Sequence, residues 1–280
     1  MRIFVAGASG VLGRAFLPLA VERGYEVIGM TRSSVGARTV ESLGAVPALA
    51  DALDRKQLGR ALAAARPDVV VDLLTDLATG DSGSNARLRT EGTRNLVDAA
   101  HQAGVSQIVA ESISWVYAPG TDPADENEGL DAEAVEPRLT TIRGITALEA
   151  AVREVPHSAV LRFGQLYGEG TWYARDGRFA DAARAGELAA TETVTSFLHI
   201  DDAAAATLAA LDWPTGVWNI VDDEPAAGTE WVPVFADAVG APAPTVTRAG
   251  DIGRPVSNAR ARAQGLTLRH PSWRDGFRTL

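Results

Sequence analysis

Three glycines near the N-terminus have the spacing to hold a phosphate group. They stand in Gly7-Ala8-Ser9-Gly10-Val11-Leu12-Gly13, between a short apolar segment and a segment with helical spacing. Glycine permits a tight turn and lets backbone N–H groups approach an anion, and the N-terminus of a helix adds a favourable dipole. The strand–turn–helix context favours a dinucleotide-binding loop over a glycine-rich turn without a ligand. We therefore expect the cofactor to contact Gly7, Ser9, Gly10, Val11, Leu12 and Gly13.

The elements that position this loop alternate between apolar strands and helices. Strands are predicted at 2–6, 26–30, 46–50, 67–74, 106–110 and 157–162, and helices at 54–65, 86–103 and 140–154. This alternation predicts an α/β fold, a Rossmann-type doubly wound parallel sheet that binds its ligand at the carboxyl ends of the strands. The pattern loosens after Phe163, where we expect strands at 197–200 and 217–221 and helices at 203–211 and 230–239. Residues 1–163 and 196–222 are assigned to the Rossmann domain, and 164–195 and 223–280 to a smaller C-terminal substrate lobe.

The composition excludes several classes of protein. The chain has 280 residues and a net charge of −10, which argues against binding to nucleic acid or to an anionic membrane. It has no cysteine, which excludes disulfides and thiol catalysis and fits a reducing compartment. The four histidines show no metal-ligand spacing, so no metal site is expected. Since no apolar run has the length of a membrane span and no signal peptide precedes the first strand, we expect a cytoplasmic protein. We further expect a monomer or a homodimer that acts on a small molecule.

Four further segments follow the glycine loop in an order that is typical of one family. They are Gly92-Thr93-Arg94-Asn95-Leu96, residues 162–170, residues 196–202 and Gly216-Val217-Trp218-Asn219-Ile220. With the loop, they resemble the GxxGxxG, GT-x-NL, R-(x)n-YGPG, F-x-HVDD and G-x-Y/W-N motifs of the extended short-chain dehydrogenases/reductases, which include nucleotide-sugar epimerases and dehydratases. The resemblance runs over nearly the whole chain. It implies an oxidoreductase with a nicotinamide dinucleotide and a small substrate lobe above it.

The residues after the second predicted strand indicate which dinucleotide binds. Residues 30–34 read Met-Thr-Arg-Ser-Ser and contain no carboxylate, whereas NAD-binding chains normally carry Asp or Glu there. Arg32 offers a bidentate partner for a 2′-phosphate and Ser33 a hydroxyl, so we expect NADP(H); an exposed arginine without a ligand is the alternative. The resemblance implies that Asp51 lies at the adenine edge, unless it only caps a helix, and that Thr75 lies near the nicotinamide ribose.

The catalytic residues that the resemblance implies are missing. The family uses a Ser or Thr with a Tyr-x-x-x-Lys pair, in which the tyrosine transfers a proton and the lysine lowers its pKa. Lys56 is the only lysine of the chain, and no tyrosine has a lysine four residues later. The resemblance implies that Thr141 stands at the tyrosine position. Weak candidates for the proton path are Ser112, Ser114 and Thr141, besides water, the substrate itself and the tyrosines 117 and 167.

Aromatic residues gather in the segments that the family places around its substrate. They are Trp115, Tyr117, Tyr167, Trp172 and Tyr173, and as a group they favour a flat, apolar ligand over a role in packing the lobe. Members of the family that lack the triad include ketoreductases that tailor aromatic polyketide antibiotics. The leading hypothesis is therefore an NADPH-dependent ketoreductase in antibiotic biosynthesis, with the proton taken from substrate or water. The alternatives are a nucleotide-sugar epimerase or dehydratase with a rearranged acid/base, and a non-catalytic NADP(H) sensor.

Overall fold

The computed structural model describes residues 1–76, 80–248 and 253–280, and the chain divides into two compact units. Unit 1 comprises Met1–Ser112, Ala132–Leu161 and Thr207–Val217; unit 2 comprises Ile113–Asp131, Arg162–Ala206 and Trp218–Leu280. This division differs from the predicted domains at residues 113–131, 162–163, 196–206 and 218–222, which belong to unit 2. The physical reason is local packing, since Tyr117 is hydrogen-bonded to Asn219 and Phe197 lies in an aromatic core of unit 2.

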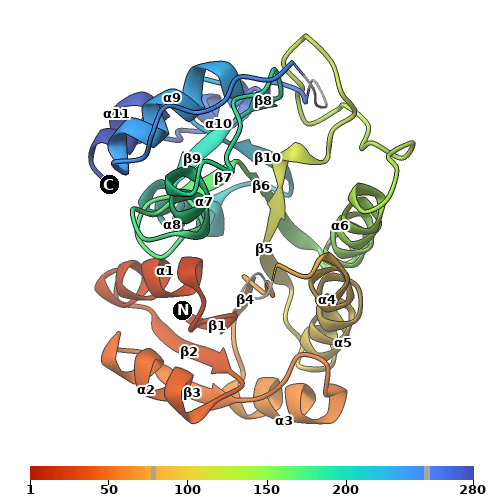
Figure 1. Ribbon diagram of the computed structural model, residues 1–280. Coiled ribbons are helices and arrows are strands. Elements are labelled where there is room, and N and C mark those ends of the chain that lie inside the picture. The colour runs from red at the N-terminus through yellow and green to blue at the C-terminus, as the bar shows by residue number, and fades with distance from the viewer. Residues whose placement is uncertain (77–79, 249–252) are drawn as a thin grey trace. The chain divides into compact units, whose positions relative to one another are not determined.

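A seven-stranded sheet in the order β10-β6-β5-β4-β1-β2-β3 confirms the predicted α/β, Rossmann-type fold (Figure 1). Its strands are β1 (Arg2–Ala6), β2 (Glu26–Thr31), β3 (Val46–Leu49), β4 (Val69–Asp72), β5 (Gln107–Ile113), β6 (His157–Phe163) and β10 (Gly216–Ile220). Pairing is parallel from β3 through β2, β1 and β4 to β5. The carboxyl ends of β1, β4 and β5 therefore meet at one edge, where such sheets bind their ligands.

Helices cover the sheet of unit 1. They are α1 (Val11–Glu22), α2 (Ser34–Ser42), α3 (Arg55–Ala65), α4 (Ser82–Arg87), α5 (Thr93–Gln102) and α6 (Arg138–Val152). The apolar faces of α3, α5 and α6 pack on side chains of β1, β4, β5 and β6 in one buried cluster. The Asp54 carboxylate caps α3 by accepting hydrogen bonds from the amides of Lys56 and Gln57, both at 3.0 Å, as the sequence predicts. None of the helices among the described residues combines the length and apolar character needed to cross a membrane.

The prediction of one continuous helix over 86–103 is wrong. The helical segment already begins at Ser82, because the Asp81 side chain accepts hydrogen bonds from the amides of Gly83 and Ser84. A π-helical turn, η1 (Leu88–Gly92), then separates α4 from α5. Such turns redirect side chains and are frequent at functional sites. The turn carries Arg89, a buried residue that the sequence analysis did not select.

Unit 2 contains short elements around an aromatic core. They are β7 (Gln165–Tyr167), β8 (Val194–Thr195), β9 (Phe197–His199), β11 (Ala226–Ala227), α7 (Arg178–Arg184), α8 (Ile200–Ala209), α9 (Gly228–Ala238), α10 (Ala259–Ala263), α11 (Trp273–Arg278) and the 3-10 turn η2 (Ser114–Val116). The last three residues of α8 and the 3-10 turn η3 (Ala210–Asp212) that follows it belong to unit 1. The core joins Phe197 of β9, Trp231 and Phe235 of α9, and Trp273 and Phe277 of α11.

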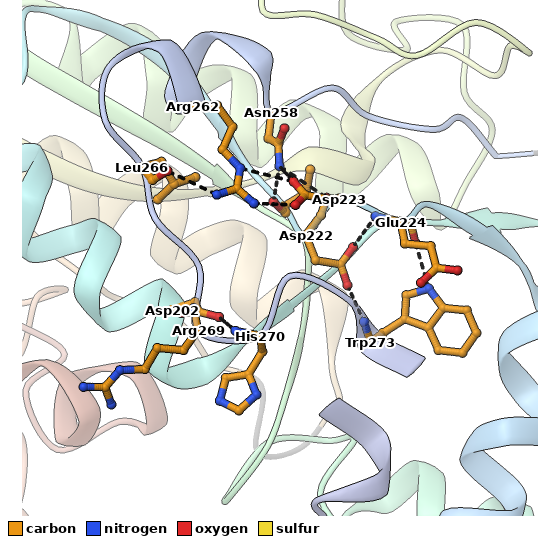
Figure 2. A network of polar contacts seen from close by, with 11 residues as sticks. Asp202, Asp222, Asp223, Glu224, Asn258, Arg262, Leu266, Arg269, His270 and Trp273 are labelled. Carbon is orange, nitrogen blue, oxygen red and sulfur yellow. Dashed lines mark hydrogen bonds and ion pairs between the residues drawn. The ribbon is translucent and has the colours of Figure 1, made fainter. Parts of the chain in front are cut away.

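Two buried carboxylates fix the C-terminal segment of unit 2 (Figure 2). Asp202 accepts hydrogen bonds from the backbone amides of Arg269 at 2.7 Å and His270 at 2.9 Å. Asp222 accepts one from the amide of Trp273 at 2.9 Å. These contacts hold the chain that leads into α11 against the aromatic core, and burial raises the pKa of Asp222 to about 8.

Candidate active site

The glycine loop is built so that its backbone comes very close to its neighbours. Gly7 has φ +86°, and a Cβ added there would lie 2.3 Å from the carbonyl oxygen of Leu73 after β4. A Cβ at Gly13 would lie 2.4 Å from the Gly7 carbonyl oxygen, so α1 can start this close to β1 only with glycine. Gly10 is exposed and precedes the first turn of α1, which begins at Val11 and Leu12. The loop therefore presents the free amides of a helix N-terminus at the carboxyl edge of the sheet.

The region after β2 is closed by hydrogen bonds between small residues. The Ser9 and Thr31 hydroxyls lie 3.0 Å apart, and a Cβ at Gly36 would lie 2.1 Å from the Thr31 hydroxyl. The Ser33 hydroxyl accepts the Gly36 amide at 3.0 Å and caps α2, which leaves its own hydrogen free for a ligand. Arg32 is exposed beside it.

The other predicted cofactor residues lie at the ends of the next strands of unit 1. Asp51 is half-buried, and one of its oxygens accepts the Leu53 amide at 2.9 Å. Thr75 is half-buried in the segment that follows β4. Sequence and structure therefore bring the predicted cofactor residues to the same edge of one sheet, and their contacts with a dinucleotide stay a prediction.

A group of buried charges that the sequence analysis missed lies at the ends of β4 and β5. Asp72 accepts hydrogen bonds from the Leu74 amide at 3.1 Å and the Thr93 hydroxyl at 3.0 Å, and burial raises its pKa to about 6. Glu111 is half-buried, and burial raises its pKa to about 7 against the opposing effect of the Arg89 charge. Arg89 is 4% exposed, and burial lowers its pKa. Polar residues at the ends of apolar strands were the available signal, but the sequence does not show the π-helical turn that brings Arg89 to them.

Ser112 is engaged in a buried hydrogen bond. Its hydroxyl donates to Glu149 at 2.9 Å, and the second oxygen of Glu149 accepts from Arg153 at 3.1 Å. The bond ties β5 to α6, and it occupies the only hydrogen that Ser112 can donate. Thr141 is half-buried on α6, whereas Ser114 is buried in η2 of unit 2. Their catalytic roles stay a prediction.

Tyr117 is the centre of a buried polar network in unit 2. Its hydroxyl accepts a hydrogen bond from Arg162 at 2.7 Å and donates to Asn219 at 2.8 Å. The ring lies 5.0 Å from the Arg162 guanidinium carbon, and burial raises the pKa of the phenol. Proton transfer from this hydroxyl would break its bond to Asn219.

The remaining predicted substrate residues divide into two groups. Tyr167 and Tyr173 lie in the aromatic core, where burial raises the pKa of both phenols. Tyr173 stacks on Phe179 with 4.4 Å between ring centroids. Trp172 is half-buried and Trp115 is 36% exposed, so these two indoles keep surface that a ligand can contact. A role for the group in substrate binding stays a prediction.

Unit 2 also brings together two histidines that lie far apart in the sequence. The ligand atoms of His199, Asp201 and His270 all lie within 4.8 Å of one another. The two rings stack at 3.8 Å, and the Nδ1 atom of His199 accepts the Asp201 amide. Lone pairs of stacked rings lie in the ring planes and do not converge on one point, so this geometry favours a packed pair of rings over a metal site.

Sequence comparisons identify relatives across the length of the chain. The profile of the NAD dependent epimerase/dehydratase family matches residues 3–220. The chain is 40% identical to a 3-diazoavenalumate denitrifying reductase of a Streptomyces species, in an alignment that covers 99% of both proteins. It is 34% identical to the 4-hydroxy-2-methyl-3-oxo-4-farnesyl-3,4-dihydroquinoline-1-oxide ketoreductase of Stigmatella aurantiaca over 43% of this chain and 36% of that protein.

Solved structures share the fold. The UDP-glucose 4-epimerase of Thermotoga maritima with UDP-glucose has a TM-score of 0.80 at 21% identity, covering 99% of this chain and 96% of that one. WbmG of Bordetella bronchiseptica in complex with NAD has a TM-score of 0.80 at 23% identity, covering 99% and 91%. The solved structures show that the fold is shared. The family profile and the 40% identical relative show the family to which the chain belongs. The chain therefore belongs to the NAD-dependent epimerase/dehydratase family of extended short-chain dehydrogenases/reductases, and it is an oxidoreductase of that family.

Proposed function

We propose that the chain is an NADPH-dependent reductase that removes a diazo group from a hydroxylated aromatic compound. The observation that carries this proposal is the 40% identity over 99% of both chains to a denitrifying reductase, in a chain that keeps the whole glycine loop. The missing Tyr-x-x-x-Lys pair agrees with it, since a diazo group is an activated acceptor and dinitrogen is an excellent leaving group. The acceptor thus requires less from the protein than a simple ketone does.

The reaction balances with one hydride and one proton. At neutral pH an aromatic ring with a hydroxyl beside its diazo group loses the hydroxyl proton and becomes a diazo ketone. A C–H bond forms at the diazo carbon, the C–N bond breaks with its electron pair on the departing dinitrogen, and the ring oxygen regains a proton as a phenol. Bound NADPH supplies the hydride and leaves as NADP⁺. The protein holds the ring in place and excludes water. Holding the reacting groups in the right orientation by itself gives a large gain in rate.

NADPH is favoured over NADH by the residues at the end of β2. Residues 31–34 offer no carboxylate to repel a 2′-phosphate, and Arg32 is exposed there. The Ser33 hydroxyl hydrogen is free because its oxygen accepts the Gly36 amide. Arg14 lies beside the loop, held through its guanidinium by the Ser9 carbonyl at 3.0 Å. These groups fit a dianionic phosphate.

An aromatic ketone is the second candidate acceptor, and the ketoreductase relative favours it. In that reaction the hydride binds to the carbonyl carbon and a proton to its oxygen, which gives a secondary alcohol. A ketone beside a phenol, as in aromatic polyketides, is polarised by its own intramolecular hydrogen bond. General-acid catalysis typically contributes about 10²- to 10⁴-fold, so such a substrate partly compensates for a missing protein acid.

The test is turnover by the purified protein with NADPH. Hydroxyaryl diazo acids and hydroxyaryl ketones are offered separately, and reactions without protein give the spontaneous rate. With NADPH that carries deuterium at its transferable position, we expect one deuterium at the former diazo carbon and release of dinitrogen. Deuterium at a carbinol carbon would favour the ketone instead. Failure of every acceptor to oxidise NADPH above the spontaneous rate would contradict both reactions and favour a non-catalytic NADP(H)-binding protein.

A further inference from the structure

Glu111 lies where this fold brings ligands to the sheet. In the register of β4 and β5, Asp72 pairs with Ala110, so Glu111 stands one residue beyond the last pair of β4. The carboxyl ends of these central strands form the ligand-binding edge of a doubly wound sheet. A carboxyl group at this place is close in the fold to the residues expected around the nicotinamide ribose.

The Glu111 carboxyl has no hydrogen-bond or ion-pair partner among the described residues, unlike the buried acids around it. Asp72 receives two hydrogen bonds, and Glu149 receives hydrogen bonds from Ser112 and Arg153. Among the residues that the structure describes, none donates a hydrogen bond to Glu111 and none forms an ion pair with it within 4 Å. Glu111 is half-buried, and its oxygens are not among the fully buried polar atoms without a partner, so the carboxyl is free to bind a ligand at this edge of the sheet.

Two charged groups act on Glu111, Arg89 from η1 and Asp72 from β4. Burial and the like charge of Asp72 favour the protonated acid, whereas the positive charge of Arg89 favours the carboxylate. The balance places the pKa of Glu111 at about 7. An acid with a pKa near the operating pH is the best compromise between holding a proton and releasing it. Arg89 thus acts on Glu111 in the same sense as the lysine acts on the tyrosine in a Tyr-x-x-x-Lys pair, by favouring the deprotonated form.

We propose that Glu111 donates its carboxyl proton to the substrate oxygen that becomes negatively charged when the hydride is added, with Arg89 as its positioning residue. The O–H bond of the Glu111 carboxyl breaks, a new O–H bond forms on the phenol or alcohol product, and the carboxylate regains a proton from water. This inference rests on the proposed hydride transfer. It assigns a protein acid to a chain that lacks the tyrosine and the lysine of its family.

The test compares two substrates in Glu111→Gln, which keeps the shape of the side chain but has no acidic proton. The first substrate is a hydroxyaryl diazo acid or ketone, which needs a proton; the second is an aryl diazonium acid without a hydroxyl, which needs hydride only. We expect kcat to fall about 10²-fold or more with the first substrate and to stay within about threefold with the second. Glu111→Asp should recover part of the rate. Equal losses on both substrates would indicate a structural role and overturn the proposal, as would unchanged rates on both.

The pH profile separates a proton donor from a packing residue. In the wild type, kcat with the first substrate should fall as the pH rises through about 7, because the acid must be protonated. Glu111→Gln should lack this limb, and Arg89→Met should move it to higher pH since the charge that favours the carboxylate is gone. An identical limb in wild type and Glu111→Gln would overturn the assignment.

Failure of this inference is distinguishable from failure of the function. A wild type that reduces only the diazonium acid without a hydroxyl would leave hydride transfer standing and overturn the role of Glu111. If no acceptor is reduced, infrared difference spectra of the folded protein still report the carboxyl: a protonated-carboxyl band that titrates near neutral pH and is absent from Glu111→Gln supports the acid. A Glu111 that is ionised throughout the neutral range overturns it.

Discussion

Polar side chains at the carboxyl edge of the sheet in unit 1 and in the interior of unit 2 differ in whether they have hydrogen-bond partners within the fold. In unit 1, Glu111 is half-buried without a partner and Arg32 is exposed beside a capped helix. In unit 2, the Tyr117 hydroxyl is held by Arg162 and Asn219, and Asp202 and Asp222 are satisfied by backbone amides. A polar group that is hydrogen-bonded within the fold is held in place, whereas a half-buried group without such a partner is available to a ligand. The difference supports the proposed role of Glu111 over proton transfer from the Tyr117 hydroxyl.

The largest expected effect is on NADPH binding, and it should differ between two glycines with similarly close neighbours. A Cβ at Gly7 would lie 2.3 Å from the Leu73 carbonyl oxygen, and a Cβ at Gly276 would lie 2.1 Å from the Tyr167 hydroxyl. We expect Gly7→Ala to weaken NADPH binding by about 100-fold or more, because the loop must move away from the helix N-terminus that binds the phosphate. Gly276→Ala should lower stability and leave NADPH affinity unchanged. Fluorescence titration and urea unfolding measure the two.

A matched control for Gly7 is Gly24, which has φ +83° and nothing within 4 Å of an added Cβ. Gly24→Ala should cost only the about 1–2 kcal/mol of a left-handed alanine and keep NADPH affinity. If Gly24→Ala weakened NADPH binding as much as Gly7→Ala does, general destabilisation would explain both, and the special role of the loop would be lost.

The next effect concerns the 2′-phosphate. We expect Arg32→Ala to weaken NADPH binding by about 10- to 100-fold, the loss of one or two charge-assisted hydrogen bonds, and to change NADH binding by less than about threefold. The matched control is Arg23, an exposed arginine at the C-terminal end of α1. Arg23→Ala should change neither NADPH binding nor NADH binding. Calorimetry with both dinucleotides decides the matter. Equal weakening of NADPH and NADH by Arg32→Ala would contradict the assignment to the 2′-phosphate.

Two tyrosines of unit 2, Tyr117 and Tyr167, should differ in how much their hydroxyls contribute to stability. Tyr117→Phe removes the hydroxyl that accepts from Arg162 and donates to Asn219, and the loss of these two buried hydrogen bonds should cost about 1–3 kcal/mol of unfolding free energy. The Tyr167 hydroxyl is buried with no hydrogen-bond partner among the described residues, so Tyr167→Phe should be neutral or slightly stabilising. Urea unfolding at constant pH measures both. A large loss of stability in Tyr167→Phe would reveal an unrecognised bond to its hydroxyl.

Local patterns were enough to predict the scaffold of the site. The spacing of Gly7, Gly10 and Gly13 between a strand and a helix predicts the loop, and the position of Asp54 before a helical segment predicts its cap. The loop and the cap are set by residues near in sequence, whereas the close approach of Gly7 to Leu73 after β4 joins positions far apart in the chain. The fold, the loop and the region after β2 therefore follow from sequence spacing.

The polar cluster could not be predicted from the same patterns. Arg89 and Glu111 are 22 positions apart, and a π-helical turn brings the arginine to the acid. His199 and His270 are farther apart still, yet their rings stack at 3.8 Å. Likewise, the hydroxyl of Ser112 was a candidate by its position, and the sequence does not reveal that Glu149 accepts its hydrogen. Side-chain direction and long-range pairing decide each of these cases.

The smallest effect tests the proton on Glu111 through stability alone. Its folded pKa of about 7 lies above the ordinary 4.5, so the folded protein binds more protons than the unfolded chain between these values. Glu111 therefore lowers stability as the pH rises from about 4.5 to 7, and Glu111→Gln should gain about 1–2 kcal/mol relative to wild type over that range. Glu133→Gln, at an exposed acid of unit 1, is the matched control for the substitution itself. Parallel stability curves for wild type and Glu111→Gln would mean that Glu111 is already ionised in the fold, and the acid for a proton-requiring acceptor would then have to be water or the substrate.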